Sequence, residues 1–345
     1  ALVIISSGHT ITLNVAATPD YLIIENAAAL IGTSNLTVGY DIRADGAGGF
    51  APTGGTWLVT RNVTFTGASA SSTSSSAVTT ISGDLTMASG STLTLNNALT
   101  VSGNLADNGI IAASANNITL NGTAKNISGT GTITGSGTIT TTNNKSILAG
   151  TNLTIAPTFA LSAATTITNN GAITLSGNLT GADATTSIWI NAAGSVLNVA
   201  SAVLSTGVLN ASASPNTVNY NGGGAQTVKI TVPPAYGYNQ LIISIAGVKT
   251  YVGGIMEIGT LLTVQDAAIF DVTVAPFNGA GGLTMSGTSE LRIANGGAVP
   301  GLTGAYNLTG GTIVFYRAGN QTIRSIGLNG PAPAGSGSRV ATQAS

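Results

Sequence analysis

The chain has 345 residues, of which only 6% are charged while 43% are hydrophobic, and its net charge is −1. An ordinary soluble domain carries about 25% charged residues, so Thr, Ser, Asn and Gly must supply the polar surface here. This composition excludes a disordered chain, and the scattered Lys and Arg residues make nucleic acid and acidic membranes poor partners.

Cysteine is absent, which excludes disulfides, Cys-based zinc sites and thiol catalysis. No apolar run reaches the roughly 20 residues of a membrane-spanning helix, so we expect no membrane insertion. The single histidine, His9, excludes a His-paired metal site within one chain and argues against a Ser–His–Asp triad.

The elements predicted along the chain are short strands. At the start, Val3 and Ile5, and then Ile11 and Leu13, are apolar residues two positions apart on either side of a turn at 6–8. The same unit of two apolar pairs separated by a polar corner recurs later, where each apolar pair would point to one side of its strand. It recurs at Leu85, Met87, Leu93 and Leu95, at Leu262, Val264, Phe270 and Val272, and at Leu283, Met285, Leu291 and Ile293.

These units return at a nearly constant interval. The segment from Ser82 to Leu85 is followed 20 residues later by the similar segment from Ser102 to Leu105, and Leu262 is followed 21 residues later by Leu283. Such a period is typical of stacked arrays. We therefore predict an all-β, right-handed parallel β-helix, a β-solenoid, with coils of about 20 residues. Tandem β-sandwiches are the alternative, because they also have short, evenly spaced strands.

Three regions are predicted. Residues 1–210 form solenoid coils with a flexible, protruding Ser-rich loop at 68–77. Residues 211–330 form further coils containing a 95-residue repeat, in which 217–228 resembles 312–323. Residues 331–345 are rich in Pro, Gly and Ser and are predicted to be a tail or linker.

Few residues suggest a site. Asp41, Arg43 and Asp45 would share one strand face, so Asp41 and Asp45 are a weak candidate for a Ca²⁺ site, with an exposed salt-bridged turn as the plainer interpretation. A loop is predicted around Pro233, Pro234, Tyr236 and Tyr238, and its exposed Tyr236 and Tyr238 are candidate ligand contacts. We predict no catalytic residues and no cofactor.

Pairs of threonines flank single apolar residues throughout. A stacked array of such hydroxyls would suit an ice-binding solenoid, whereas an outward strand face rich in Thr is the simpler interpretation. The pairs are Thr10/Thr12, Thr64/Thr66, Thr92/Thr94, Thr132/Thr134, Thr138/Thr140 and Thr166/Thr168.

The segment 4–14, and the segment 217–228 with its continuation 241–243, resemble repeats of large secreted surface proteins of Bacteroidota-like bacteria, including adhesins and gliding-associated filaments. The resemblance covers most of residues 1–325. It implies a β-helix region of an adhesin-type protein, located outside the cell on the bacterial surface.

The expected function is therefore a non-enzymatic structural subunit or segment of an extracellular filament or surface adhesin. It would associate with itself through solenoid ends or faces, or with other cell-surface components, including glycans. Two alternatives stay open. One is a polysaccharide-binding or polysaccharide-cleaving β-helix using Asp41, Asp45, Tyr236 and Tyr238, and the other is an ice-binding solenoid.

Overall fold

The computed structural model describes residues 1–231, 237–273, 277–294 and 301–316. Across these ranges the chain is all-β, with 41 strands and no helix. Strands pair in parallel and coils follow one another about 21 residues apart, so the predicted β-solenoid is confirmed and tandem sandwiches are excluded. The chain divides into two compact units, Ala1–Ser187 (unit 1) and Ile188–Ser345 (unit 2), earlier than the predicted boundary at 210.

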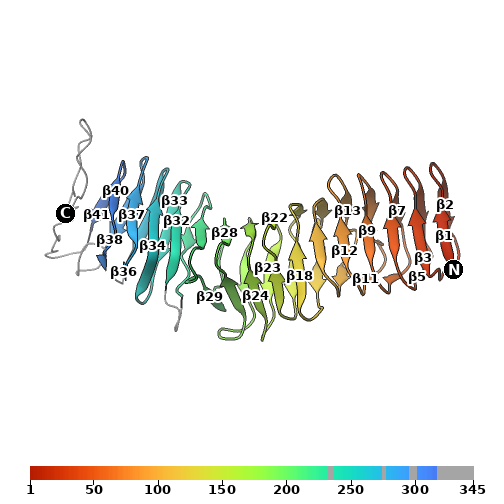
Figure 1. The fold of residues 1–345 in the computed structure, drawn as a ribbon, viewed down its shortest axis with the longest axis horizontal. Helices are drawn as coiled ribbons and strands as arrows, with labels where there is room; N and C mark the ends of the chain where they lie inside the picture. The colour runs from red at the N-terminus through yellow and green to blue at the C-terminus, as the bar shows by residue number, and fades with distance from the viewer. Residues whose placement is uncertain (232–236, 274–276, 295–300, 317–345) are drawn as a thin grey trace. The chain divides into compact units, whose positions relative to one another are not determined.

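Unit 1 has three strands in each coil, and equivalent strands of successive coils pair to form three faces (Figure 1). Face 1 consists of β1 (Leu2–Ile5), β3 (Tyr21–Ile24), β6 (Ile42–Ala44), β9 (Val63–Phe65), β12 (Leu85–Met87), β15 (Leu105–Asp107), β18 (Lys125–Ser128), β21 (Lys145–Ile147) and β24 (Thr166–Asn169). Face 2 differs because its strands form two sheets, with no pairing between β7 and β10. The first sheet is β2 (Thr10–Leu13), β4 (Ala29–Gly32) and β7 (Gly49–Pro52), and the second contains β10 (Ala70–Ser72), β13 (Thr92–Thr94), β16 (Ile110–Ala112), β19 (Thr132–Thr134), β22 (Asn152–Ile155) and β25 (Ala172–Leu175). Face 3 consists of β5 (Leu36–Val38), β8 (Trp57–Val59), β11 (Thr79–Ile81), β14 (Leu99–Val101), β17 (Ile118–Leu120), β20 (Thr138–Thr141), β23 (Thr158–Leu161) and β26 (Leu179–Gly181).

Unit 2 contains longer strands arranged in parallel rows. One row is β28 (Val196–Val199), β30 (Thr217–Tyr220), β32 (Tyr238–Ile243), β34 (Met256–Val264), β37 (Gly282–Met285) and β40 (Tyr306–Leu308), with β36 (Phe277–Gly279) and β39 (Gly301–Leu302) continuing from the first part of β34. A second row is β31 (Gln226–Thr227), β33 (Gly247–Tyr251), β35 (Ala268–Val272), β38 (Glu290–Ile293) and β41 (Thr312–Phe315), and β27 (Ile188–Asn191) pairs with β29 (Val208–Asn210).

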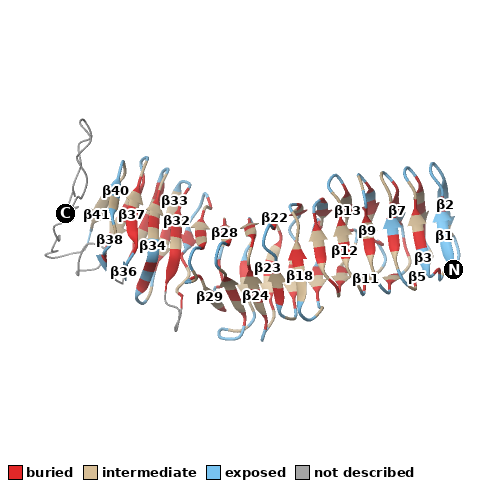
Figure 2. Cartoon of the chain, in the orientation of Figure 1, coloured by how far each residue is buried: buried red, intermediate tan, exposed pale blue. Residues whose placement is uncertain are grey.

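Apolar side chains stacked in register fill the interior of each unit, and buried residues alternate with less buried ones along the strands (Figure 2). Because alternate side chains of a strand point to opposite sides, equivalent inward positions form continuous ladders. A ladder in unit 1, with every member at most 2% exposed, is Leu22, Ile42, Val63, Leu85, Leu105, Ile127 and Ile147. A ladder in unit 2, fully buried, is Leu197, Val218, Leu241, Leu262 and Leu283.

The Ser-rich segment 68–77 is not the protruding, flexible loop that its composition predicts. It contributes strand β10, and Ser71 and Ser74 are buried. The Ser71 hydroxyl accepts a hydrogen bond from Phe50 N (3.1 Å), and the Ser74 hydroxyl donates to the Gly55 carbonyl (2.5 Å). Small side chains that bond to the backbone of the preceding coil allow a polar segment to become part of the solenoid wall.

The two segments of the predicted 95-residue repeat occupy different rows of unit 2. The first copy begins in β30, whereas the second begins in β41, which pairs with β38 in the other row. The two segments are therefore similar in sequence but do not occupy equivalent positions in the coil. The end of the second copy, beyond residue 316, and the predicted tail 331–345 lie outside the described residues.

Candidate functional surfaces

The weak Ca²⁺ candidates lie at the two ends of one short strand. Asp41 precedes β6 and Asp45 follows it, with Arg43 between them. Arg43 Nε donates to Asp45 Oδ1 (2.7 Å), and the Thr66 hydroxyl donates to the same oxygen (2.8 Å). Burial raises the pKa of Asp45, but the bonds and charge of Arg43 and the bond from Thr66 outweigh it, so the pKa is lowered. Asp45 therefore fits the plainer interpretation, a salt-bridged turn, rather than a Ca²⁺ site.

Asp41 belongs to a series of side chains that connect successive coils. Its Oδ1 accepts from the backbone N–H (3.0 Å) and the side-chain Nδ2 (2.9 Å) of Asn62, and Asn62 Oδ1 accepts from Asp84 N (2.8 Å). Asp84 Oδ1 likewise accepts from Asn104 N (2.7 Å), and Asn104 Oδ1 from Asn126 N (2.8 Å). We call these five residues the Asx ladder. Their oxygens satisfy backbone donors at the corner before face 1.

Metal binding gains no support from these carboxylates. Nowhere in the described ranges do three or more His, Asp or Glu side chains gather closely enough to hold an ion. Arg61 approaches Asp41 (3.9 Å) and also lies over the ring of Tyr40 (5.6 Å), which stacks on Tyr21 at 4.9 Å between centroids. Sequence reasoning missed this half-exposed aromatic pair, because the two residues belong to different coils.

Tyr238 is not an exposed ligand contact. It is 1% exposed, and its hydroxyl donates to the Lys229 carbonyl (2.6 Å) and lies 3.0 Å from the hydroxyl of the buried Tyr220. Burial raises the pKa of Tyr238 well above its ordinary value. The expectation of an exposed Tyr238 was wrong because this residue begins the strand β32 and points into the core. Tyr236 lies outside the described residues.

A buried carboxyl was also missed by sequence reasoning. Asp107 is 0% exposed at an inward position of face 1, where it stacks on Met87. Gly109 N donates to its Oδ1 (3.0 Å), while its Oδ2 has no hydrogen-bond partner. Burial raises the pKa of Asp107 to about 7, more than the Gly109 bond lowers it. Gly129 in the next coil has φ +116°, and a Cβ there would lie 1.9 Å from the Asp107 carbonyl oxygen.

Two inward-pointing lysines bond to backbone carbonyls. Lys249 is fully buried and donates from Nζ to the carbonyls of Gly222 (2.7 Å), Ile245 (2.7 Å) and Ala246 (3.3 Å). Lys145 donates to one carbonyl of the preceding coil, and burial together with the charge of Lys125 lowers its pKa to about 8. Lys249 fills the corner of its coil with three satisfied donors, which is a structural use of a charged side chain.

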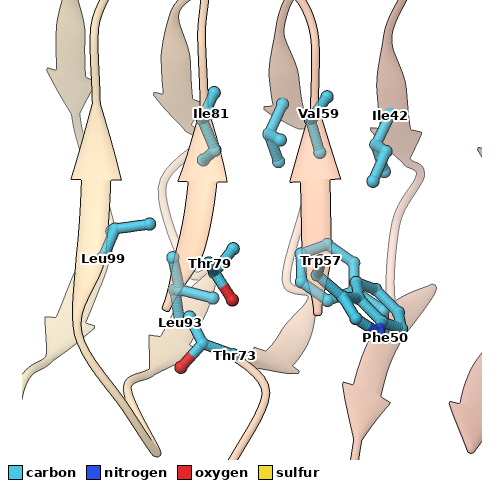
Figure 3. Close-up of a pocket in the computed structure, with 10 residues that line it drawn as sticks. Ile42, Phe50, Trp57, Val59, Thr73, Thr79, Ile81, Leu93 and Leu99 are labelled. Atoms are coloured by element: carbon cyan, nitrogen blue, oxygen red, sulfur yellow. The ribbon is translucent and has the colours of Figure 1, made fainter. Parts of the chain in front are cut away.

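A small cavity lies in the core of unit 1 (Figure 3). Its volume is about 10 Å³, and Phe50, Trp57, Thr73 and Thr79 are among its lining residues. This is near the lower limit for a single water molecule. The Trp57 Nε1 donor is buried without a partner, which marks a packing defect of the core. The cavity is too small to bind an organic ligand.

The predicted threonine pairs are distributed over all three faces of unit 1. The register instead assembles a row on face 3 from one threonine in each of four successive coils. The row is Thr80, Thr100, Thr119 and Thr140. Its spacings of 20, 19 and 21 residues are irregular enough to hide it in the sequence.

The fold and these surfaces define a parallel β-solenoid with two uncharged faces in unit 1. Comparisons with protein-family models, curated proteins and solved structures gave no match. The resemblance to Bacteroidota-type surface repeats stays a prediction. The described part of the chain offers no helix with the length and apolarity needed to cross a lipid bilayer.

Proposed function

We propose that this chain is a non-enzymatic structural segment of an extracellular filament or surface adhesin of a bacterium. The supporting observation is that its side chains mainly connect each coil to the next. Inward positions form ladders between coils, and the carboxylates and amides of the Asx ladder bond to the backbone of the neighbouring coil. A protein built in this way gains length by repeating one unit, because each coil contacts mainly its neighbours.

The first coil supports the self-association part of the proposal. Strand β1 pairs with β3 on one side, and no residue in the described part of the chain pairs with its other edge. Val3 is 41% exposed and Ile11 is 47% exposed, although both occupy ladder positions whose partners in the next coil, Leu22 and Leu30, are buried. A strand edge with exposed apolar ladder positions accepts a further parallel coil, supplied by a second copy or by sequence that precedes this segment in a longer chain.

Contact between unlike ends is heterologous, and repeated heterologous contacts produce open filaments unless the rotation closes a ring. The near-neutral charge of the chain offers little repulsion against such contacts. The location outside the cell rests on the resemblance of segments 4–14 and 217–228 to secreted surface repeats.

The test is sedimentation velocity and negative-stain electron microscopy of the chain over a range of concentrations. We expect concentration-dependent oligomers that Val3→Lys weakens, because that substitution places a charge on the exposed end of the interior. Ile4→Lys is the matched control, since Ile4 is 49% exposed but belongs to the outward-facing set of the same strand.

Monomers at every concentration would contradict self-association. Equal effects of the two substitutions would contradict an end-to-end contact. The polysaccharide alternative receives no support from the residues on which it rested, because Tyr238 is buried and Asp45 is bonded to Arg43. Release of reducing sugars from a panel of polysaccharides would contradict the non-enzymatic assignment.

A further inference from the structure

The threonine row of face 3 is flanked by further polar side chains around β20 (Thr138–Thr141). Thr80, Thr100, Thr119 and Thr140 lie in consecutive strands β11, β14, β17 and β20. Parallel strands lie about 4.8 Å apart, so equivalent side chains repeat at that distance along the solenoid. Outward residues on one strand are two positions apart, which adds a second repeat of about 6.7 Å. The central row is therefore periodic along the solenoid, and the second repeat is present where the flanking positions are also polar, as they are at β20.

The array is widest at β20. There Thr138, Thr140 and the adjacent Thr142 occupy successive outward positions, and Thr138 pairs with Thr158 of β23. Asn117, which precedes β17, lies opposite Thr138, and its Oδ1 accepts a hydrogen bond from Thr138 N (3.0 Å). Face 3 thus presents hydroxyl and methyl groups in several rows.

The hydroxyls of the central row are available to a ligand. Thr80, Thr100, Thr119 and Thr140 form no side-chain hydrogen bond to other described residues, whereas threonines such as Thr60 donate to a carbonyl of the preceding coil (3.0 Å). All four are half-buried. Threonine is β-branched and stiff about χ1, and the paired strands fix the backbone. Such an array loses little conformational freedom on binding.

The chemistry of the face restricts what it can bind. The strands of face 3 contain no Asp, Glu, Lys or Arg, and their aromatic residues Trp57 and Phe159 are buried in the core. An ionic ligand finds no opposite charge there, and a sugar ring finds no aromatic surface to stack on. A fitting ligand is uncharged, both donates and accepts hydrogen bonds, and repeats at regular short intervals.

We propose that face 3 of unit 1 binds ice, with Thr80, Thr100, Thr119 and Thr140 as its central contacts. Water molecules in an ice surface are an uncharged, periodic set of donors and acceptors, and they match a fixed array of hydroxyls separated by methyl groups. The inference is independent of end-to-end assembly, because it uses the side of the solenoid. End-to-end contacts in a filament would leave face 3 uncovered, so the two proposals are compatible.

The experiment measures thermal hysteresis and the incorporation of the fluorescently labelled chain into growing ice. We expect the chain to produce a freezing-point gap, to shape ice crystals and to be taken up by the ice. Thr119→Lys places a bulky charge in the centre of the array and should abolish most of this activity. Thr86→Lys is the matched control, since Thr86 is a half-buried outward residue of face 1 between Thr64 and Ala106.

Thermal unfolding of both variants by circular dichroism shows whether the fold is retained. Thr119→Val removes only the hydroxyl and serves as a second variant, with partial loss expected. Normal ice growth in the presence of the folded chain would overturn the proposal, as would equal effects of Thr119→Lys and Thr86→Lys. Binding to crystalline chitin or cellulose without any effect on ice would also overturn it in favour of a polysaccharide ligand.

Discussion

Replacing Asp107 with Asn should stabilise unit 1 at alkaline pH and have little effect at acidic pH. Asp107 is fully buried, and its pKa is raised from 3.8 to about 7. A carboxyl with a raised pKa in the folded state favours its protonated form there. Its contribution to stability is therefore complete below pH 3.8 and is lost as the pH rises through about 7.

The magnitude follows from that shift. A difference of about three pKa units corresponds to about 4 kcal/mol between pH 3 and pH 8, since each unit is worth about 1.4 kcal/mol. Asn keeps an oxygen for Gly109 N, and its amide, like the hydroxyl of protonated Asp107, is an unpaired donor at the Oδ2 position, so this cost is common to both side chains. The gain should therefore be close to zero at pH 3 and about 4 kcal/mol at pH 8.

A similar corner within unit 1 shows that Asn is compatible with this position. Gly171 N donates to Asn169 Oδ1 (3.1 Å), just as Gly109 N donates to Asp107, and both corners continue with Asn and Gly. The reverse change, Asn169→Asp, is the matched control and should introduce the same loss of stability with rising pH.

The assay is urea unfolding followed by circular dichroism between pH 3.5 and 8. The free energy of unfolding of Asp107→Asn, relative to the original chain, should rise across this range. A difference that is constant with pH would refute the reasoning, because it would show that Asp107 does not change its protonation on unfolding.

Three further outcomes are expected in unit 1, two from substitutions and one from a titration. Leu85→Ala should lower the free energy of unfolding by about 2–5 kcal/mol because it removes a fully buried ladder member, whereas Thr86→Ala on the outward side should change it by less than about 0.5 kcal/mol. Gly129→Ala should lower the melting temperature far more than Gly150→Ala, since only the former brings a Cβ against a backbone oxygen while both have positive φ. The carboxyl of Asp183 accepts hydrogen bonds from Thr185 and Thr186, so its pKa measured by NMR should be about 2. Its stabilising effect is then lost as the pH falls from about 4 through 2. A titration midpoint near pH 4 would contradict these hydrogen bonds.

The strands and their stacking could be predicted because alternation is a local property. Leu85 and Met87 point inward from β12, and their separation from Leu105 gives the coil length directly. The same reasoning located the polar corner at Asp84, although not its role. Its bonds to Asn104 depend on which residues become neighbours across coils, and the varying coil length hides that information.

Segments whose structure differs from what their local amino-acid composition suggests could not be predicted. A run of Ser and Thr suggests flexibility, yet Ser71 and Ser74 are buried because the preceding coil offers donors and acceptors to their hydroxyls. Tyr238 comes shortly after two prolines in the sequence but begins a strand, and Tyr220 and Lys229 supply partners for its hydroxyl. In each case the deciding partner is about 10–30 residues away in sequence, beyond the reach of a local pattern.

Because of the Asx ladder, a coil can be added to unit 1 or removed from it without loss of the hydrogen bonds at this corner. Asp84 and Asn104 each accept from the backbone N–H of the ladder residue that follows, and each precedes a buried leucine that begins a face 1 strand. Deletion of residues 85–104 would join Asp84 to Leu105 and place Asn126 opposite Asp84, with the same acceptor and donor. Recombination between coils could therefore shorten or lengthen the gene in frame and still encode an unbroken wall.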